Sequence, residues 1–276
     1  MYKRQAILFV ILTTVSLYFS FSKSEIVFDD HGLFTNLRVY EFAQEPVDFK
    51  ARTFPYFTLG LIQVLTQSLA ANRIFNVLLH LACACLMFLL LRALIYAAKT
   101  RANRFSELKD CRSIDVLSAV VAFSFSLHPI AVYGVAYLAQ RTGLFALFFS
   151  LLSLWFYRRA FDESRSIDII AAALFYSLAV FSKEHAIMLP LAALPLAAIY
   201  GGSWRSHFKR MALYLVLCLP AALTVLLATK HIVASSYEPD VAAMLPQMQN
   251  ITVMAQARGE LSLIHISEPT RLRRIS

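Results

Sequence analysis

The chain has 276 residues, of which 59% are hydrophobic and only 16% are charged, and its mean hydropathy is +0.61. These values lie outside the range of soluble domains and are typical of a polytopic membrane protein. The net charge is +9, but the basic residues form short clusters between apolar runs, a distribution that sets membrane orientation. We therefore predict no nucleic-acid partner. The spacing of the cysteines fits neither a disulfide framework nor a zinc site (Cys83, Cys85, Cys111 and Cys218).

A membrane-spanning helix requires about 20 mostly apolar residues, because the hydrocarbon core is about 30 Å thick. We predict an all-α bundle of about seven transmembrane helices, the first an uncleaved signal anchor, from the apolar runs 5–22, 75–97, 114–127, 138–157, 167–182, 186–200 and 211–229. The stretch 56–70 is interrupted by polar residues that would be costly in lipid. For it we predict an interfacial or re-entrant helix.

Lysine and arginine residues in the short loops fall on alternate sides of successive spans, and therefore all on one face. The positive-inside rule identifies that face, and the N-terminus, as cytoplasmic. The outer face then receives the long first loop, 23–57, the His128-Pro129 turn, the turn at 183–185 and the segment after Lys230. Several acidic residues lie in this long loop, including the adjacent pair Asp29 and Asp30.

Ionisable residues at membrane depth are costly and usually have a role. Arg141 lies about one turn into an apolar run and needs an anionic partner. Further candidates occur near the outer turns: Asp29, Asp30, His31, Arg52, His128, Lys183, Glu184 and His185. A carboxylate acting as general base accelerates attack by a hydroxyl roughly 10²- to 10⁴-fold. Cations stabilise the charge that develops on a leaving phosphate, so the set suits a lipid-phosphate-linked donor.

Structural roles stay open for each of these residues. Arg141 could extend to lipid head groups or pair with Glu184, and Lys183 and Glu184 could cap helices. His128 before Pro129 is often a helix-end residue, and aspartates favour turns and N-caps. His80, inside an apolar run, is expected to form a hydrogen bond within the bundle.

The polar residues lie in blocks that resemble the GT-C superfamily of lipid-phosphosugar-dependent glycosyltransferases. The resemblance is to the branch of the transmembrane-and-tetratricopeptide O-mannosyltransferases and their bacterial relatives. The blocks occur in the family's order: 26–36 with its Asp-Asp pair, 52–59, 76–81 with its Asn and His, 127–141 with its His-Pro turn and Gln-Arg pair, and 182–191 with its Ser-Lys-Glu and Leu-Pro elements. Thr53 stands where the family has a proline.

By this resemblance, Asp29 or Asp30 is the general base. We favour Asp29, because in an extended segment it shares a side with His31. The resemblance also implies that the donor phosphate is bound by Arg141, Lys183 and Arg52. The supporting residues would be His31, His128, Glu184 and His185. No cofactor is predicted with certainty. Carboxylates also suit a divalent cation, so metal dependence is left open.

The implied activity is that of an inverting hexosyl- or pentosyltransferase. It would transfer a sugar from a polyprenyl-phosphate-linked donor to a protein Ser/Thr hydroxyl, at the periplasmic face of a bacterial inner membrane. A shorter relative, such as the enzymes that glycosylate type IV pilin, is an equally good match. Two other classes stay open: a non-catalytic scaffold, and a transporter or lipid flippase. The transporter is disfavoured because the charges cluster at one face and no repeat is evident.

The last residues differ in kind from the rest of the chain. The segment 261–276 resembles the conceptual translation of a transposon-end adapter used in sequencing-library preparation. We expect a GT-C-like transmembrane domain over 1–260, incomplete at its C-terminus, followed by a non-native tail that is excluded from fold reasoning. The alternative is a natural basic tail.

Overall fold

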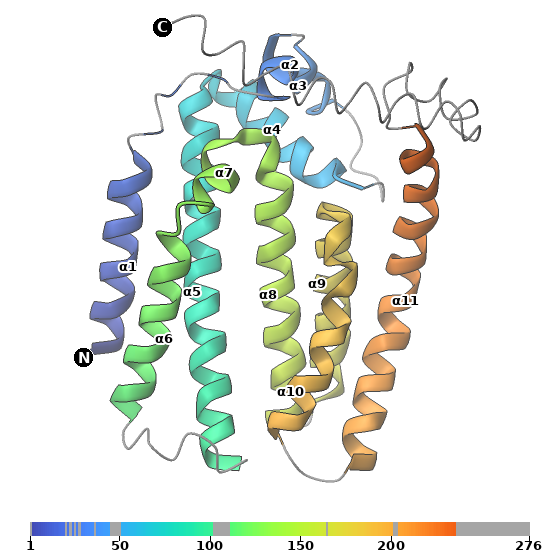
Figure 1. Cartoon of the computed structure of the whole chain (residues 1–276). Coiled ribbons are helices and arrows are strands. Elements are labelled where there is room, and N and C mark those ends of the chain that lie inside the picture. The colour runs from blue at the N-terminus through green and yellow to red at the C-terminus, as the bar shows by residue number, and fades with distance from the viewer. Residues whose placement is uncertain are drawn as a thin grey trace, which may run out of the picture. The chain divides into compact units, whose positions relative to one another are not determined.

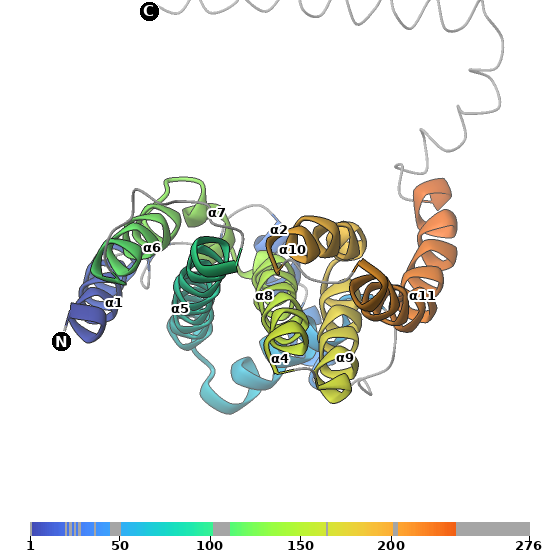
Figure 2. The same ribbon diagram turned by 90° about the horizontal axis from the view of Figure 1, so that it is seen from below.

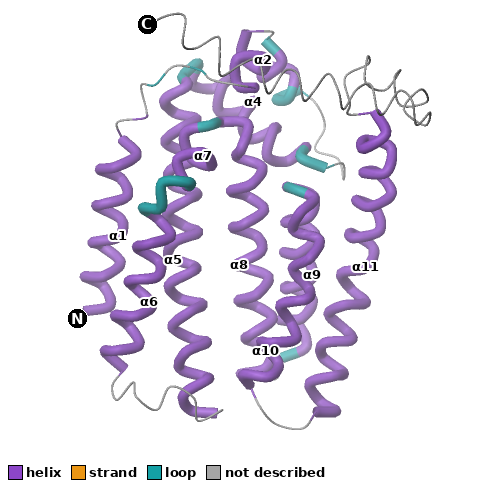
Figure 3. The backbone as a smooth tube through the Cα atoms, in the orientation of Figure 1, coloured by secondary structure: helices purple, strands orange, loops and turns teal. Residues whose placement is uncertain are grey.

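The computed structural model describes residues 2–19, 21, 24, 26, 29–35, 37–44, 51–101, 111–163, 165–200 and 204–235. The adapter-like tail lies outside them. Every regular element in the described part of the chain is helical, as Figure 3 shows, which confirms the all-α prediction. The chain divides into two compact units, Met1–Val225 and Leu226–Ser276, and all helices that end before residue 201 belong to the first.

Helices make up most of the described part of the chain. In order they are α1 (Tyr2–Phe19), α2 (Asp29–Thr35), α3 (Arg38–Glu41), α4 (Thr53–Thr66), α5 (Leu69–Arg101), α6 (Cys111–Ser126), α7 (Ala131–Ala136), the 3₁₀ helix η2 (Leu138–Gln140), α8 (Arg141–Asp162), α9 (Ser166–Ser182), the 3₁₀ helix η3 (Glu184–Ala192), α10 (Ala193–Tyr200) and α11 (Trp204–Ser235). Figure 1 shows α5, α6, α8 and α9 side by side, and Figure 2 shows them end-on. The short helices α2, α4 and α7 gather at the end where α5 and α8 begin.

Among the described residues, three helices are long and apolar enough to cross a membrane: Leu69–Thr100, Leu138–Asp162 and Phe208–Ala228. They correspond to three of the seven predicted spans, 75–97, 138–157 and 211–229. The apolar helices Thr53–Thr66, Ser166–Ser182 and Glu184–Tyr200 have 10–17 residues. Seventeen residues extend about 26 Å, less than the hydrocarbon thickness of about 30 Å. The structure therefore supports membrane association through three helices of spanning length.

The stretch 56–70 is not one helix, and our prediction for it was wrong in that respect. α4 ends at Thr66 and α5 begins at Leu69. Gln67, between them, has a left-handed backbone with φ 51°, and its N–H donates to the Gln63 carbonyl at 2.8 Å. This conformation cannot continue a right-handed helix, so the polar residues mark a turn between two helices.

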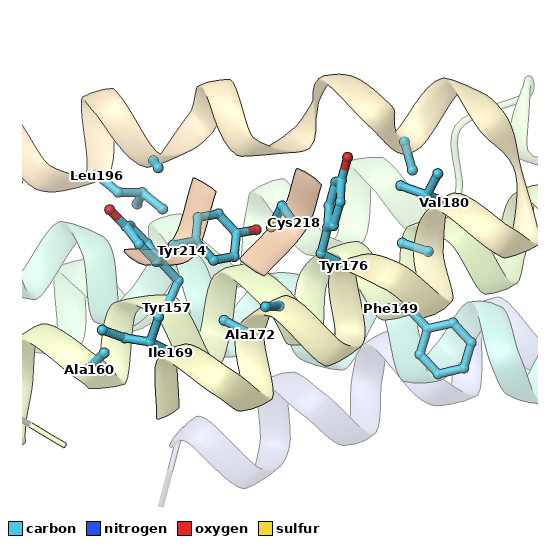
Figure 4. Packing of buried hydrophobic residues seen from close by; sticks show 14 of the residues in the cluster. Phe149, Tyr157, Ala160, Ile169, Ala172, Tyr176, Val180, Leu196, Tyr214 and Cys218 are labelled. Carbon is cyan, nitrogen blue, oxygen red and sulfur yellow. The ribbon is translucent and has the colours of Figure 1, made fainter. Parts of the chain in front are cut away.

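Small residues and a few internal hydrogen bonds hold α8, α9 and α11 together. Figure 4 shows Tyr157, Tyr176, Tyr214 and Cys218 packed among the buried residues of these helices. The Ser153 hydroxyl on α8 donates to the Ala172 carbonyl of α9 at 2.8 Å and lies 2.9 Å from the Tyr214 hydroxyl of α11. Since lipid competes for apolar contacts, close packing and such hydrogen bonds stabilise membrane helix pairs.

Candidate functional site

Asp30 joins the first loop to the start of α8. Its side chain is only 1% exposed, and its two carboxylate oxygens accept the backbone N–H groups of Leu138 and Ala139, each at 2.7 Å. The first N–H groups of a helix have no partner within the helix, so a carboxylate satisfies them well. The bonds therefore fix α2 against η2, directly before Arg141.

Asp29 is the first residue of α2, and its side chain lies outside the described residues. We expected an extended segment here, and that expectation was wrong because residues 29–35 form a helix. Our reason for preferring Asp29, the alternation of sides along a strand, is therefore lost. The position of Asp30 supplies a different one, since its buried carboxylate already accepts two backbone N–H groups.

Arg141 is fully buried and makes hydrogen bonds to three residues. Its Nε donates to Asn76 Oδ1 at 2.8 Å, and its Nη2 donates to the Asn72 carbonyl at 2.9 Å and to Asn72 Oδ1 at 2.8 Å. Its Nη1 lies 3.4 Å from Thr58 Oγ1. The guanidinium also packs over the Phe75 ring, with Cζ 4.7 Å from the centroid. Neutral amides thus surround the charge, and the attraction of Asp30 reaches it as well.

These amides form a chain that our sequence reasoning did not identify as part of the site. Asn72 Nδ2 donates to Gln63 Oε1 at 3.0 Å, and Asn76 Nδ2 donates to the Val135 carbonyl at 3.2 Å. A signal was available, because Asn72, Asn76 and His80 are spaced by four residues in an apolar helix and so share one face. His80 makes the expected bond within the bundle, with Nε2 3.1 Å from a carbonyl of α6.

Arg52 and Glu184 form an ion pair between the start of α4 and the start of η3. Arg52 Nε donates to Glu184 Oε2 at 3.3 Å, and Nη2 contacts the other carboxylate oxygen. The pair raises the pKa of Arg52. Burial would raise the pKa of Glu184, but the hydrogen bonds from Arg52 and from the Glu184 backbone, together with the charges of Arg52 and Lys183, outweigh burial and lower the pKa. Glu184 therefore pairs with Arg52, and Arg141 pairs with amides.

The backbone of Arg52 is strained. Its φ is 69°, which is costly for a residue other than glycine, and its N–H donates to the Phe181 carbonyl at the end of α9 at 2.6 Å. Such strain is often found at functional sites, where the surrounding structure maintains it.

Lys183 lies beside this pair and reaches back to the start of α8. Its Nζ donates to Gln140 Oε1 at 2.7 Å, while Gln140 Nε2 donates to the Tyr133 hydroxyl at 3.1 Å. Burial, and then the nearby charge of Arg52, lower the pKa of Lys183. Since Asp30 binds the residues just before Gln140, the turn 138–141 connects the acidic loop with Lys183.

The predicted supporting histidines are less closely connected. His31 is exposed, with Nδ1 3.0 Å from Thr35 Oγ1 in its own helix. His128 is exposed, and its Nδ1 accepts the N–H of Ile130 at 3.3 Å. His185 is exposed next to the ion pair, and its pKa is lowered by burial and then by Lys183. No group of three metal-ligating side chains occurs within the described ranges.

Comparisons with known proteins do not assign this site. No protein-family profile matches the chain, and no curated protein or solved structure is significantly similar to it.

Proposed function

We propose that this chain is a membrane glycosyltransferase of the GT-C type, which transfers a sugar from a polyprenyl-phosphate donor to a Ser/Thr hydroxyl of a protein. The observation that carries the proposal is the pair of bonds from Asp30 to Leu138 and Ala139, together with the bond from Lys183 to Gln140. Asp30, more than 100 residues away in the sequence, and Lys183 are thereby brought to one turn, and Asp29 is the chain neighbour of Asp30. That juxtaposition is what an acid-dependent attack on a lipid phosphosugar requires.

Asp29 is the general base in this proposal, since Asp30 is buried and bonded to the backbone. The acceptor oxygen attacks the anomeric carbon of the sugar and transfers its proton to the Asp29 carboxylate. The bond between that carbon and the phosphate oxygen breaks, and polyprenyl phosphate leaves with the bonding electrons. A single displacement of this kind inverts the anomeric configuration.

Lys183 and Arg52 stabilise the phosphate, because both are partly accessible while Arg141 is enclosed. Glu184 holds Arg52 in place until the phosphate arrives. Arg141 and Asp30 are positioning residues that fix the turn 138–141 relative to α2 and α5. Direct phosphate binding by Arg141 stays a prediction, which its contacts with Asn72 and Asn76 disfavour.

The proposed orientation follows from the far ends of the helices. Arg158 and Arg159 lie in the last turns of α8, opposite the end where Asp30 binds. By the positive-inside rule this supports an orientation in which the Asp30 end faces away from the cytoplasm, and in our proposal that side is the periplasm of a bacterial inner membrane. Polyprenyl-phosphate sugars are accessible to proteins there, and a pilin is one suitable acceptor.

The test is sugar transfer by the full chain in lipid nanodiscs, with undecaprenyl-phosphate-linked mannose, glucose and arabinose as donors and a Ser/Thr-rich peptide as acceptor. We expect transfer from at least one donor, and loss of that transfer in D29N with unchanged folding. Glu41→Gln is the matched control, because Glu41 is an exposed acid on α3 in the same loop. Normal transfer by both D29N and D30N would refute the acid-base assignment and favour a scaffold.

A further inference from the structure

A cavity lies between α5 and α8, at the opposite end of these helices from Asp30. Its volume is about 480 Å³, and polar and aromatic side chains line much of it: Arg92, Tyr96, Thr100, Trp155, Arg158 and Asp162. The proposed transfer reaction uses none of these residues.

The cavity lies at head-group depth if α5 crosses a membrane. α5 has 33 residues and so extends about 50 Å, more than the hydrocarbon thickness of about 30 Å. The predicted span 75–97 on α5 ends just after Tyr96, so Arg92 and Tyr96 lie in its last turns, near the membrane boundary. On α8, Asp162 is the last residue and Arg158 lies one turn before it. Both walls of the cavity therefore end at the lipid-water boundary.

The lining offers donors in a held geometry. The Arg158 guanidinium lies over the Trp155 ring, with Cζ 4.4 Å from the centroid, and Nη1 forms an ion pair with Asp162. Arg92 Nε pairs with Asp115 of α6. A guanidinium has five N–H donors in a fork that fits phosphate, so each arginine can keep its carboxylate and still donate to a ligand. The wall between them is apolar, formed by Leu89 and Ala93.

We propose that this cavity binds the phosphodiester head group of a membrane phospholipid in the inner leaflet. Arg92 and Arg158 donate to the phosphate, Tyr96 and Trp155 lie at the interface where such rings are favoured, and one acyl chain follows the apolar wall. Asp162 keeps its pair with Arg158, but its negative charge repels the phosphate. The site is independent of the proposed sugar transfer, since it shares no residue with that reaction.

Charge changes of opposite sign test this site. Native mass spectrometry of the full chain released from phosphatidylglycerol nanodiscs counts retained lipids. We expect the double variant R92Q/R158Q to lower lipid retention roughly tenfold, and D162N to raise it, because D162N removes a negative charge that repels the phosphate. Arg165→Gln is the matched control, because Arg165 lies near the same end of the bundle, pairs with Glu163 and does not line the cavity. Equal retention in all four proteins would overturn the proposal.

A filling variant checks the same site without a change of charge. Ala93→Leu adds volume at the cavity wall, and we expect it to lower retention while the purified protein stays monodisperse. The source of the phosphate is tested by competition. Inorganic phosphate or glycerol phosphate at millimolar concentration should leave the bound lipid in place, since neither carries an acyl chain. Displacement of the lipid by either soluble anion would overturn the assignment to a phospholipid.

Discussion

The charged residues at the two ends of α8 differ in burial and in how far away in the sequence their partners lie. At its start, Asp30 and Arg141 are almost completely buried, and their partners lie far away in the sequence: 108 residues separate Asp30 from Leu138, and 65 separate Arg141 from Asn76. At its end, Arg158 and Arg159 pair with acids four residues along the chain, and Arg159 also lies 3.8 Å from the Asp168 carboxylate of α9. The second kind of pair forms as soon as the helix does. The first kind exists only when the whole bundle is folded.

This difference predicts which substitutions lower the free energy of unfolding most. Exposed pairs spaced by four residues contribute about 0.3–0.5 kcal/mol, whereas breaking a buried charged network costs about 3–5 kcal/mol. Buried, long-range polar contacts are therefore expensive to maintain, and their presence at the Asp30 end indicates a requirement for fixed geometry there. Matched substitutions at the two ends test this contrast directly.

The largest effect is expected for R141A. Removal of the guanidinium takes away the hydrogen bonds that Asn72 and Asn76 accept from it, and it removes the attraction between Arg141 and the buried Asp30 carboxylate. We therefore expect a loss of about 3–5 kcal/mol in unfolding free energy. Reversible unfolding in micelles measures it. Arg165→Ala near the other end is the control, because Arg165 pairs with Glu163 at the surface, and it should change the unfolding free energy by less than about 1 kcal/mol. Similar losses in both variants would contradict the contrast between the ends.

The variants D30N and D29N should distinguish the positioning role of Asp30 from the general-base role of Asp29. An amide has one acceptor oxygen, so D30N leaves one of the two backbone N–H groups at Leu138 and Ala139 unpaired, at a cost of about 1–3 kcal/mol. D29N should retain the wild-type unfolding free energy and lose sugar transfer. Unfolding and transfer assays on the two variants check both statements. Loss of stability in D29N with none in D30N would reverse our assignment of roles.

Gly60→Ala should displace the first loop without a change of charge. A Cβ at Gly60 would lie 2.5 Å from the Val39 carbonyl oxygen and 2.7 Å from the Ala43 nitrogen, so α3 must move away from α4. We expect a loss of about 1–3 kcal/mol and reduced transfer. Gly32→Ala in α2 is the control, because a Cβ there meets nothing within 4 Å. Wild-type transfer by G60A would mean that the position of α3 is immaterial to the site.

Local pattern predicted more of the fold than of the site. Apolar runs located α5, α8 and α11, because hydrophobicity over about 20 residues is a local property of the chain. The end of α4 at Gln67 depends on one left-handed residue with no glycine to mark it, and the helix at 29–35 replaced a predicted extended segment. Backbone conformation at such points follows from tertiary contacts that sequence pattern does not contain.

The same limit applies to the site, where local pattern identified single residues but not their tertiary contacts. Arg52, Lys183 and Glu184 could be singled out because charge next to an apolar run is conspicuous. Their pairing could not, since Glu184 was expected to be available to Arg141 but binds Arg52. Asn72 is neutral and short and was not singled out, and Asn76 was noted only within the block 76–81, so neither was assigned to the site until the geometry showed both beside the Arg141 guanidinium.

The smallest effect concerns pH. Burial and the charge of Arg52 lower the pKa of Lys183, while the pKa of Arg52 itself is raised by Glu184. As pH rises, Lys183 therefore loses its proton before Arg52 does, and the attraction for a phosphate weakens by up to about fivefold for one screened charge. We expect undecaprenyl phosphate binding to fall between neutral and alkaline pH in the wild type. Lys183→Arg should flatten that profile, because arginine stays protonated throughout. An unchanged pH profile in this variant would show that the phosphate does not contact Lys183.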